Sequence, residues 1–156
     1  MIPLAFRRMV EQVIRGRLGF PQFVAPNTIS HAGDLTTSGT TELTLITQTL
    51  AAPPVAGQIH VSAFATFVTG TVAGDNFQVR LYIAGSIVSK ALHYIYNASG
   101  ADFRTTSLSA TAAIAASTGQ IIKLTVVRNG GTGTVTSQGG YNGLSWLILP
   151  GAGVTA

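Results

Sequence analysis

The chain has 156 residues, a length that suits one domain and is too short for two. Only 9% of the residues are charged, against about 25% in an average soluble domain, whereas 46% are hydrophobic. This composition excludes a disordered chain, and no apolar run reaches the roughly 18 residues of a membrane helix. Cysteine is absent, which excludes disulfides and thiolate chemistry. A domain with so many apolar residues is expected to bury part of its surface against other chains.

Residues 1–20 are predicted to form an N-terminal helical anchoring arm. They carry four arginines against one glutamate, while the rest of the chain is nearly neutral. Over residues 3–18, apolar side chains recur every three or four positions, as on one face of an amphipathic helix. Such a short helix is marginal alone in water, so we expect it to dock on a partner. The expected anchor comprises the apolar Phe6, Met9, Val10, Val13 and Ile14, with Arg7, Arg8 and Arg15 pairing to acidic groups of that partner.

A Pro-containing linker over residues 21–28 is expected to connect this arm to a domain over residues 29–150, followed by a flexible tail over residues 151–156. The arm has no dense basic run and no interleaved aromatic residue for base stacking, so nucleic acid is not an expected partner. Its arginines also interrupt any apolar core of a secretory signal. We therefore expect synthesis in a cytoplasm.

From residue 28 the hydrophobic period becomes two, which indicates strands. About eight strands are predicted, at 41–50, 58–69, 76–84, 87–96, 103–110, 120–128, 134–138 and 144–149. The small residues of 110–117 are interpreted as edge strand and loop, and residues 130–133 (GGTG) and 139–143 (GGYNG) as turns. Turn residues recur at roughly ten-residue intervals without intervening helices. The prediction is an all-β antiparallel sandwich or jelly roll.

The predicted strands also assign a core. In 58–69 the residues Ile59, Val61, Ala63, Ala65 and Phe67 share one face. In 76–84 the inward set is Phe77, Val79, Leu81 and Ile83, and in 120–128 it is Ile122, Leu124 and Val126. Trp146 alternates with Leu144 and Ile148, so we interpret it as a core residue.

Four segments combine this alternation with a particular placement of glycines. They are residues 55–67 (VAGQIHVSAFATF), 76–88 (NFQVRLYIAGSIV), 108–127 (LSATAAIAASTGQIIKLTVV) and 141–150 (YNGLSWLILP). In this order they resemble the jelly roll of the tumour necrosis factor and complement globular-head superfamily. The resemblance implies a trimer whose flat β faces pack around a threefold axis. The low charge and short arm also resemble the small trimeric jelly rolls that tailed phages use as capsid decoration proteins and fibre knobs.

The sequence contains none of the common catalytic signatures, such as a Walker loop, GxSxG or HExxH. His31, His60 and His93 lie far apart, and we interpret them as hydrogen-bonding residues rather than as a metal cluster. Asp75 and Asp102 lie among loop residues and are expected to bond turns. We therefore predict a protein that is not an enzyme, with no catalytic, cofactor-binding or metal-ligating residues.

Tyr82, Tyr94 and Tyr96 lie on or near two neighbouring predicted strands and are predicted to form a subunit interface. Tyrosine covers a large area at low entropy cost and finds a partner for its hydroxyl.

The leading hypothesis is a structural virion protein: a trimeric capsid decoration, or cement, protein that attaches to the capsid or another virion protein through its arm. The alternative is a fibre-tip or surface receptor module that binds glycan, for which exposed aromatics beside loop carboxylates are expected.

Overall fold

The computed structural model describes residues 27–30, 33–53, 56–69, 74–94 and 102–150. These residues form nine strands and no helix. The strands are β1 (Asn27–Ser30), β2 (Leu35–Thr37), β3 (Leu43–Leu50), β4 (Gly57–Thr69), β5 (Asn76–Ile83), β6 (Ser86–Tyr94), β7 (Asp102–Ile114), β8 (Gln120–Gly130) and β9 (Val135–Pro150). The predicted helical arm and the tail lie outside the described residues.

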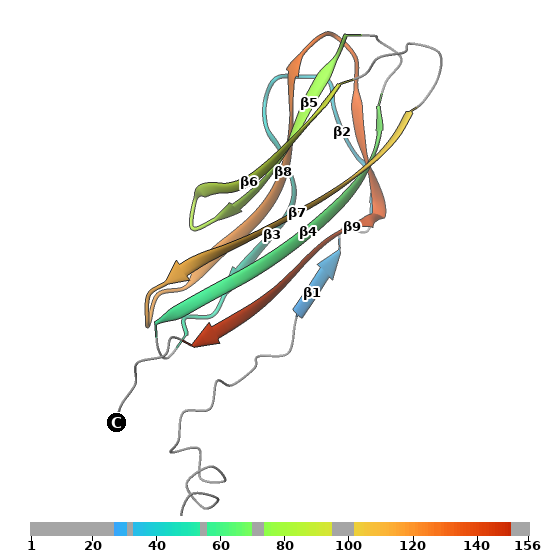
Figure 1. Ribbon diagram of the computed structural model, residues 1–156. Helices are drawn as coiled ribbons and strands as arrows, with labels where there is room; N and C mark the ends of the chain where they lie inside the picture. Colours follow the sequence, from blue (N-terminus) through green and yellow to red (C-terminus); the bar gives the residue numbers. More distant parts are fainter. Residues whose placement is uncertain (1–26, 31–32, 54–55, 70–73, 95–101, 151–156) are drawn as a thin grey trace, which may run out of the picture.

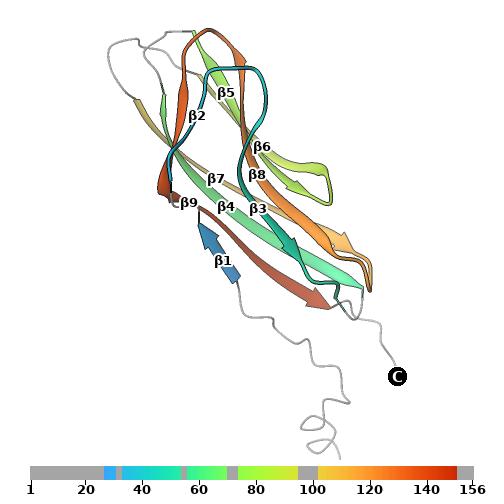
Figure 2. The same cartoon turned by 180° about the vertical axis from the view of Figure 1, so that it is seen from behind.

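The strands form two antiparallel sheets. Sheet A has five strands in the order β1-β9-β4-β7, with β2 also paired to β9, and sheet B has four in the order β3-β8-β5-β6. Sheet A faces the viewer in Figure 1, and sheet B does so in Figure 2. From β2 onward, every connection except the β5–β6 hairpin passes from one sheet to the other. This double-sheet arrangement is a jelly roll, so the predicted all-β fold is confirmed.

The core lies between the two sheets and consists of the side chains that the period-two pattern assigns to it. Every predicted inward residue of β4, β5 and β8 is buried. The rings of Phe67 in sheet A and Phe77 in sheet B meet at 5.3 Å between centroids, which ties the two layers together. Leu144 and Trp146 are buried in the same cluster, so the interpretation of Trp146 as a core residue is confirmed.

The prediction of edge strand and then loop over residues 110–117 is confirmed in β7. The strand continues to Ile114, in thirteen unbroken pairs with β4, and it is an edge strand. Alanine does not favour strands by itself, but cross-strand packing against β4 overrides that weak preference.

Strand β9 corrects one prediction, because the expected turn at residues 139–143 is the middle of a single strand. Between Ala65 and Phe67 of β4, the register of β9 jumps from Asn142 to Ser137, so a bulge faces β4 there. Gly140 supplies the positive φ of +77° that the bulge requires. The buried side chain of Asn142 holds the bulge, since it accepts a bond from the Thr66 amide and donates to the Ser137 hydroxyl.

The turn between β8 and β9 is fixed by a buried carboxylate. Asp75 accepts hydrogen bonds from the backbone amides of Thr132, at 2.9 Å, and Gly133, at 2.5 Å. Gly131 has φ +88° and stands so close to Asp75 that a Cβ there would lie 1.4 Å from its Oδ1. The expected turn at 130–133 and the expected turn-bonding role of Asp75 are both confirmed, while the side chain of Asp102 is not among those described.

Candidate functional site

The outer face of sheet A is an uncharged surface formed mainly by β4, β7 and β9. Side chains of β4, β7 and β9 alternate between the core and this face, and the registers place the outward residues in rows across the three strands. No described residue at an outward position of these three strands is Asp, Glu, Lys or Arg. The outward residues of the two strands that dominate the face are His60, Ser62, Phe64, Thr66 and Val68 in β4 and Phe103, Thr105, Ser107, Ser109, Thr111 and Ala113 in β7.

Hydroxyl groups form cross-strand bonds over this face. Nδ1 of His60 lies 3.0 Å from the Thr111 hydroxyl, and the hydroxyls of Thr66 and Thr105 lie 3.1 Å apart. Between these two pairs lies a shallow depression of about 270 Å³. Its lining is Ser62, Ala63, Phe64, Ser107, Leu108, Ser109 and Ser145. The face therefore offers neutral hydrogen-bonding groups around an aromatic ring.

Phe64 lies flat against the sheet because its cross-strand partner is Gly143. A Cβ at Gly143 would come within 2.4 Å of Cε1 of Phe64, so the ring occupies the space that any side chain would fill. The ring covers the glycine backbone, as in aromatic rescue of strand glycines. Its outer side stays in solvent, and 44% of Phe64 is exposed.

Two further exposed aromatics lie on the strands beside β4. Phe103 of β7 is the cross-strand partner of Val68 in β4, and Tyr141 lies in the bulge of β9. They are 67% and 65% exposed, the highest values among the exposed large hydrophobics of the described chain. Aromatic residues are enriched at protein interfaces relative to the rest of the surface.

His60 and Ser62 have the spacing of a base and a nucleophile, with 3.3 Å between Nε2 and Oγ. Acyl transfer also needs hydrogen-bond donors placed around an oxyanion, and backbone amides are the common ones. Strand β4 is paired with β7 on one side and β9 on the other, so its amides serve the sheet. With Thr111, the pair belongs to the hydrogen bonds between side chains on this face.

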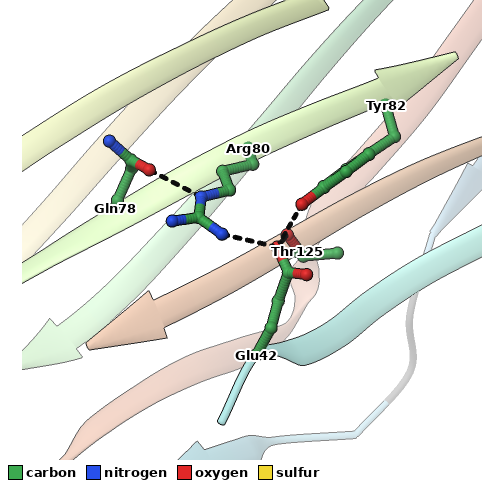
Figure 3. Close-up of polar contacts among 5 residues, drawn as sticks. All are labelled: Glu42, Gln78, Arg80, Tyr82 and Thr125. Atoms are coloured by element: carbon green, nitrogen blue, oxygen red, sulfur yellow. Dashed lines mark hydrogen bonds and ion pairs between the residues drawn. The ribbon is translucent and has the colours of Figure 1, made fainter. Parts of the chain in front are cut away.

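The outer face of sheet B differs, because it carries charges. Oε1 of Glu42, just before β3, accepts hydrogen bonds from the hydroxyls of Thr125, at 2.6 Å, and Tyr82, at 2.8 Å (Figure 3). Arg80 forms a salt bridge to the same oxygen at 3.4 Å, and the ammonium of Lys123 lies 4.4 Å from the centre of the Tyr82 ring. These bonds hold the segment that connects β2 in sheet A to β3 in sheet B against strands β5 and β8.

These interactions shift the pKa of Glu42 and the pKa of Tyr82. Partial burial alone would raise the pKa of Glu42, but the bonds from Thr125 and Tyr82 and the charges of Arg80 and Lys123 together lower it. Partial burial and the bond to Glu42 raise the pKa of Tyr82. Both shifts favour an ionised carboxylate that accepts a bond from a neutral phenol.

Replacing Glu42 by glutamine is expected to lower the free energy of unfolding by about 1–2 kcal/mol at pH 7, because bonds to a charged acceptor become bonds to a neutral one. A lowered pKa in the folded state gives stability that is present above the ordinary pKa of glutamate, about 4.3, and is lost as the pH falls through the folded value. Urea unfolding at pH 7 and pH 3 should therefore show the gap between the two proteins closing in acid. A gap of equal size at both values would contradict the assigned role.

The structure places the three predicted interface tyrosines apart. Tyr82 is part of the Glu42 network, whereas Tyr94 is 48% exposed at the end of edge strand β6. Tyr94 pairs with Asn76, six residues before Tyr82, which separates the two by about 20 Å along the strand. Tyr96 and the anchor residues of the arm lie outside the described residues, so the interface and anchor assignments remain predictions.

His93 points inward between the sheets. Its ring stacks on Phe77 with 4.9 Å between centroids and bonds the Thr106 hydroxyl on β7. Burial, and next the charge of Arg104, lower its pKa. Within the described ranges, no group of three or more His, Asp or Glu side chains is placed to hold a metal ion, and no helix could cross a membrane.

Comparison with solved structures identifies similar folds. Eiger TNF from S. frugiperda has a TM-score of 0.55 at 11% identity, over 88% of this chain and 98% of that one. Dimeric latent PorU from Porphyromonas gingivalis has a TM-score of 0.51 at 8% identity, over 82% of this chain but only 13% of that one. VP2 of infectious bursal disease virus, from its subviral particle, has a TM-score of 0.41 at 16% identity, over 83% of this chain and 38% of that one.

No family model matches the sequence, and no curated protein is similar to it in sequence. The first two structures share the fold of this chain, so the predicted resemblance to the tumour necrosis factor jelly roll is confirmed at the level of fold.

Proposed function

We propose that the protein is a non-enzymatic structural protein of a virion, a capsid decoration protein whose copies form a trimer through the outer face of sheet A. The observation that carries the proposal is the absence of charge from the described outward positions of β4, β7 and β9. Its assignment to a virion is supported by the charge-poor composition and short basic arm, together with a jelly-roll fold.

A second copy of the chain is the occupant that an uncharged face suits best. In a contact between copies this face is buried, so any charge on it would lose its hydration without a partner, at a cost of several kcal/mol. Hydroxyls, aromatics and leucines can be buried there without that cost. The charged part of the outer side of sheet B, with Arg80, Lys123 and Glu42, would remain in contact with solvent or other partners.

The outer face of sheet A is also large enough to form a stable protein interface. Strand β4 has 13 residues, so at about 3.3 Å per residue it is about 40 Å long. Four strands about 4.8 Å apart give a width of roughly 19 Å, and hence an area of roughly 750 Å². A stable protein interface buries about 800 Å² on each partner, so this face supplies nearly the whole of one side.

A threefold ring joins two different surfaces of each subunit, since only twofold contacts pair a patch with itself. We assign the outer face of sheet A as one surface and the predicted tyrosine surface as the other. Tyr94 and the exposed Leu92 at the edge of sheet B are the described residues that suit this second role. In this arrangement the arm attaches each subunit to the capsid.

Replacing Ser109 by lysine is expected to break the trimer without unfolding the chain. Ser109 is exposed and lines the depression of the proposed interface, so a lysine there is harmless in a monomer but would be buried without a partner charge in a trimer. We expect the dissociation constant to rise at least about 100-fold, from a cost of about 3 kcal/mol or more. Sedimentation measures this change, and circular dichroism checks the fold.

The matched control is Thr49→Lys. Thr49 is also exposed on a strand but lies on the outer side of sheet B, opposite exposed Ile121. The control should sediment as the unchanged protein does. Dissociation in both variants, or in neither, would refute the assignment of the interface to sheet A.

The depression around Phe64 also favours a second candidate function, recognition of a neutral glycan. An aromatic ring and serine hydroxyls match the apolar face and the hydroxyls of a sugar. This function predicts a monomer whose binding to neutral oligosaccharides is lost in the Ser109→Lys variant. Calorimetric titration with such oligosaccharides separates the two functions, because a trimer would cover the depression.

A further inference from the structure

We propose that Phe64 is the anchor of the self-association surface and that Gly143 is the residue that positions it. This inference rests on the proposed function and names the contact on which it depends. Interfaces owe most of their affinity to a few central, well-packed aromatic side chains. Phe64 is the exposed aromatic of β4, the middle strand of the face, and its ring borders the depression.

The geometry of Gly143 explains why the ring lies flat. The two residues are direct cross-strand partners, and the ring edge takes up the volume of the missing side chain, 2.4 Å from where a Cβ would be. Gly143 itself is buried under the ring. With any other residue at position 143, Phe64 would have to turn away from the sheet.

A raised ring would hold two packed faces apart. Interfaces of this kind pack as densely as protein interiors, so a side chain displaced by an ångström or two disrupts its neighbours' contacts. Glycine at 143 is therefore inferred to serve assembly more than strand formation, for which glycine is a poor choice. Its φ is not among the positive values, so the backbone itself does not require glycine there.

The test is a double-mutant cycle in the full chain, read by sedimentation. Gly143→Ala is expected to raise the dissociation constant of the trimer at least about tenfold, while circular dichroism stays unchanged. In a Phe64→Leu background, which lacks the clashing Cε1 atom, the same substitution should change the constant less than about twofold. Phe64→Leu alone should weaken the trimer, because the anchor is lost.

A trimer unaffected by Gly143→Ala would overturn the inference and leave the proposed function standing. Equal weakening by Gly143→Ala in both backgrounds would also overturn it, since Gly143 would then act on something other than Phe64. An unchanged chain that sediments as a monomer would instead refute the proposed function, and this inference with it.

Discussion

Replacing Gly131 by alanine is expected to lower the free energy of unfolding by about 3 kcal/mol or more. The new Cβ would lie 1.4 Å from Oδ1 of Asp75, so that carboxylate would have to move. It would then lose its bonds from the amides of Thr132 and Gly133, each worth about 1.5–3 kcal/mol because the acceptor is charged. Urea unfolding at one fixed protein concentration measures the loss, since association also stabilises the folded chain.

Gly85 provides the matched control, because it has a similar φ of +80° and no atom within 4 Å of the position that a Cβ would take. Gly85→Ala therefore adds only the backbone strain of a left-handed residue, about 1–2 kcal/mol. The difference between the two variants isolates the contact with Asp75. Equal losses would show that Asp75 does not hold the turn between β8 and β9.

Deleting residues 1–20 is expected to leave a folded trimer that no longer attaches to its particle. The described strands begin at Asn27, so the shortened chain keeps every one of them. Three arms on one trimer bind with avidity, so their joint loss should weaken attachment by a factor on the order of 100 or more. Co-sedimentation with particles that lack the protein measures attachment.

A point variant keeps this test independent of truncation. Val13→Asp places a charge on the predicted apolar face of the arm in the full-length chain and should also abolish attachment. Gln12→Ala changes a residue outside the predicted anchor and should leave attachment intact. Normal decoration by the shortened chain would refute the anchoring role of the arm.

The core could be predicted because the period-two alternation of apolar residues is a local pattern. Alternation in β4, β5 and β8 assigns each side chain to one face, and burial of those faces follows from the fold. The prediction failed at residues 139–143, since glycines with positive φ serve turns and bulges alike. What makes this segment a bulge is the bond between Asn142 and Thr66, 76 residues apart, which no local pattern reveals.

The candidate site was harder to predict. The sequence predicts an interface at Tyr82, Tyr94 and Tyr96, because tyrosine is typical of interfaces, but the position of a tyrosine on a sheet does not show which face is uncharged. A usable signal was present: residues 43–74, 105–122 and 129–156 contain no Asp, Glu, Lys or Arg. Only the pairing of β4 with β7 and β9 shows that these three stretches meet on one face.

Sedimentation equilibrium of the unmodified full-length chain, at micromolar concentration and neutral pH, tests the self-association of the protein directly. The proposed assembly predicts a mass three times the 16.1 kDa of one chain. A mass of 16.1 kDa that stays constant with rising concentration would contradict it.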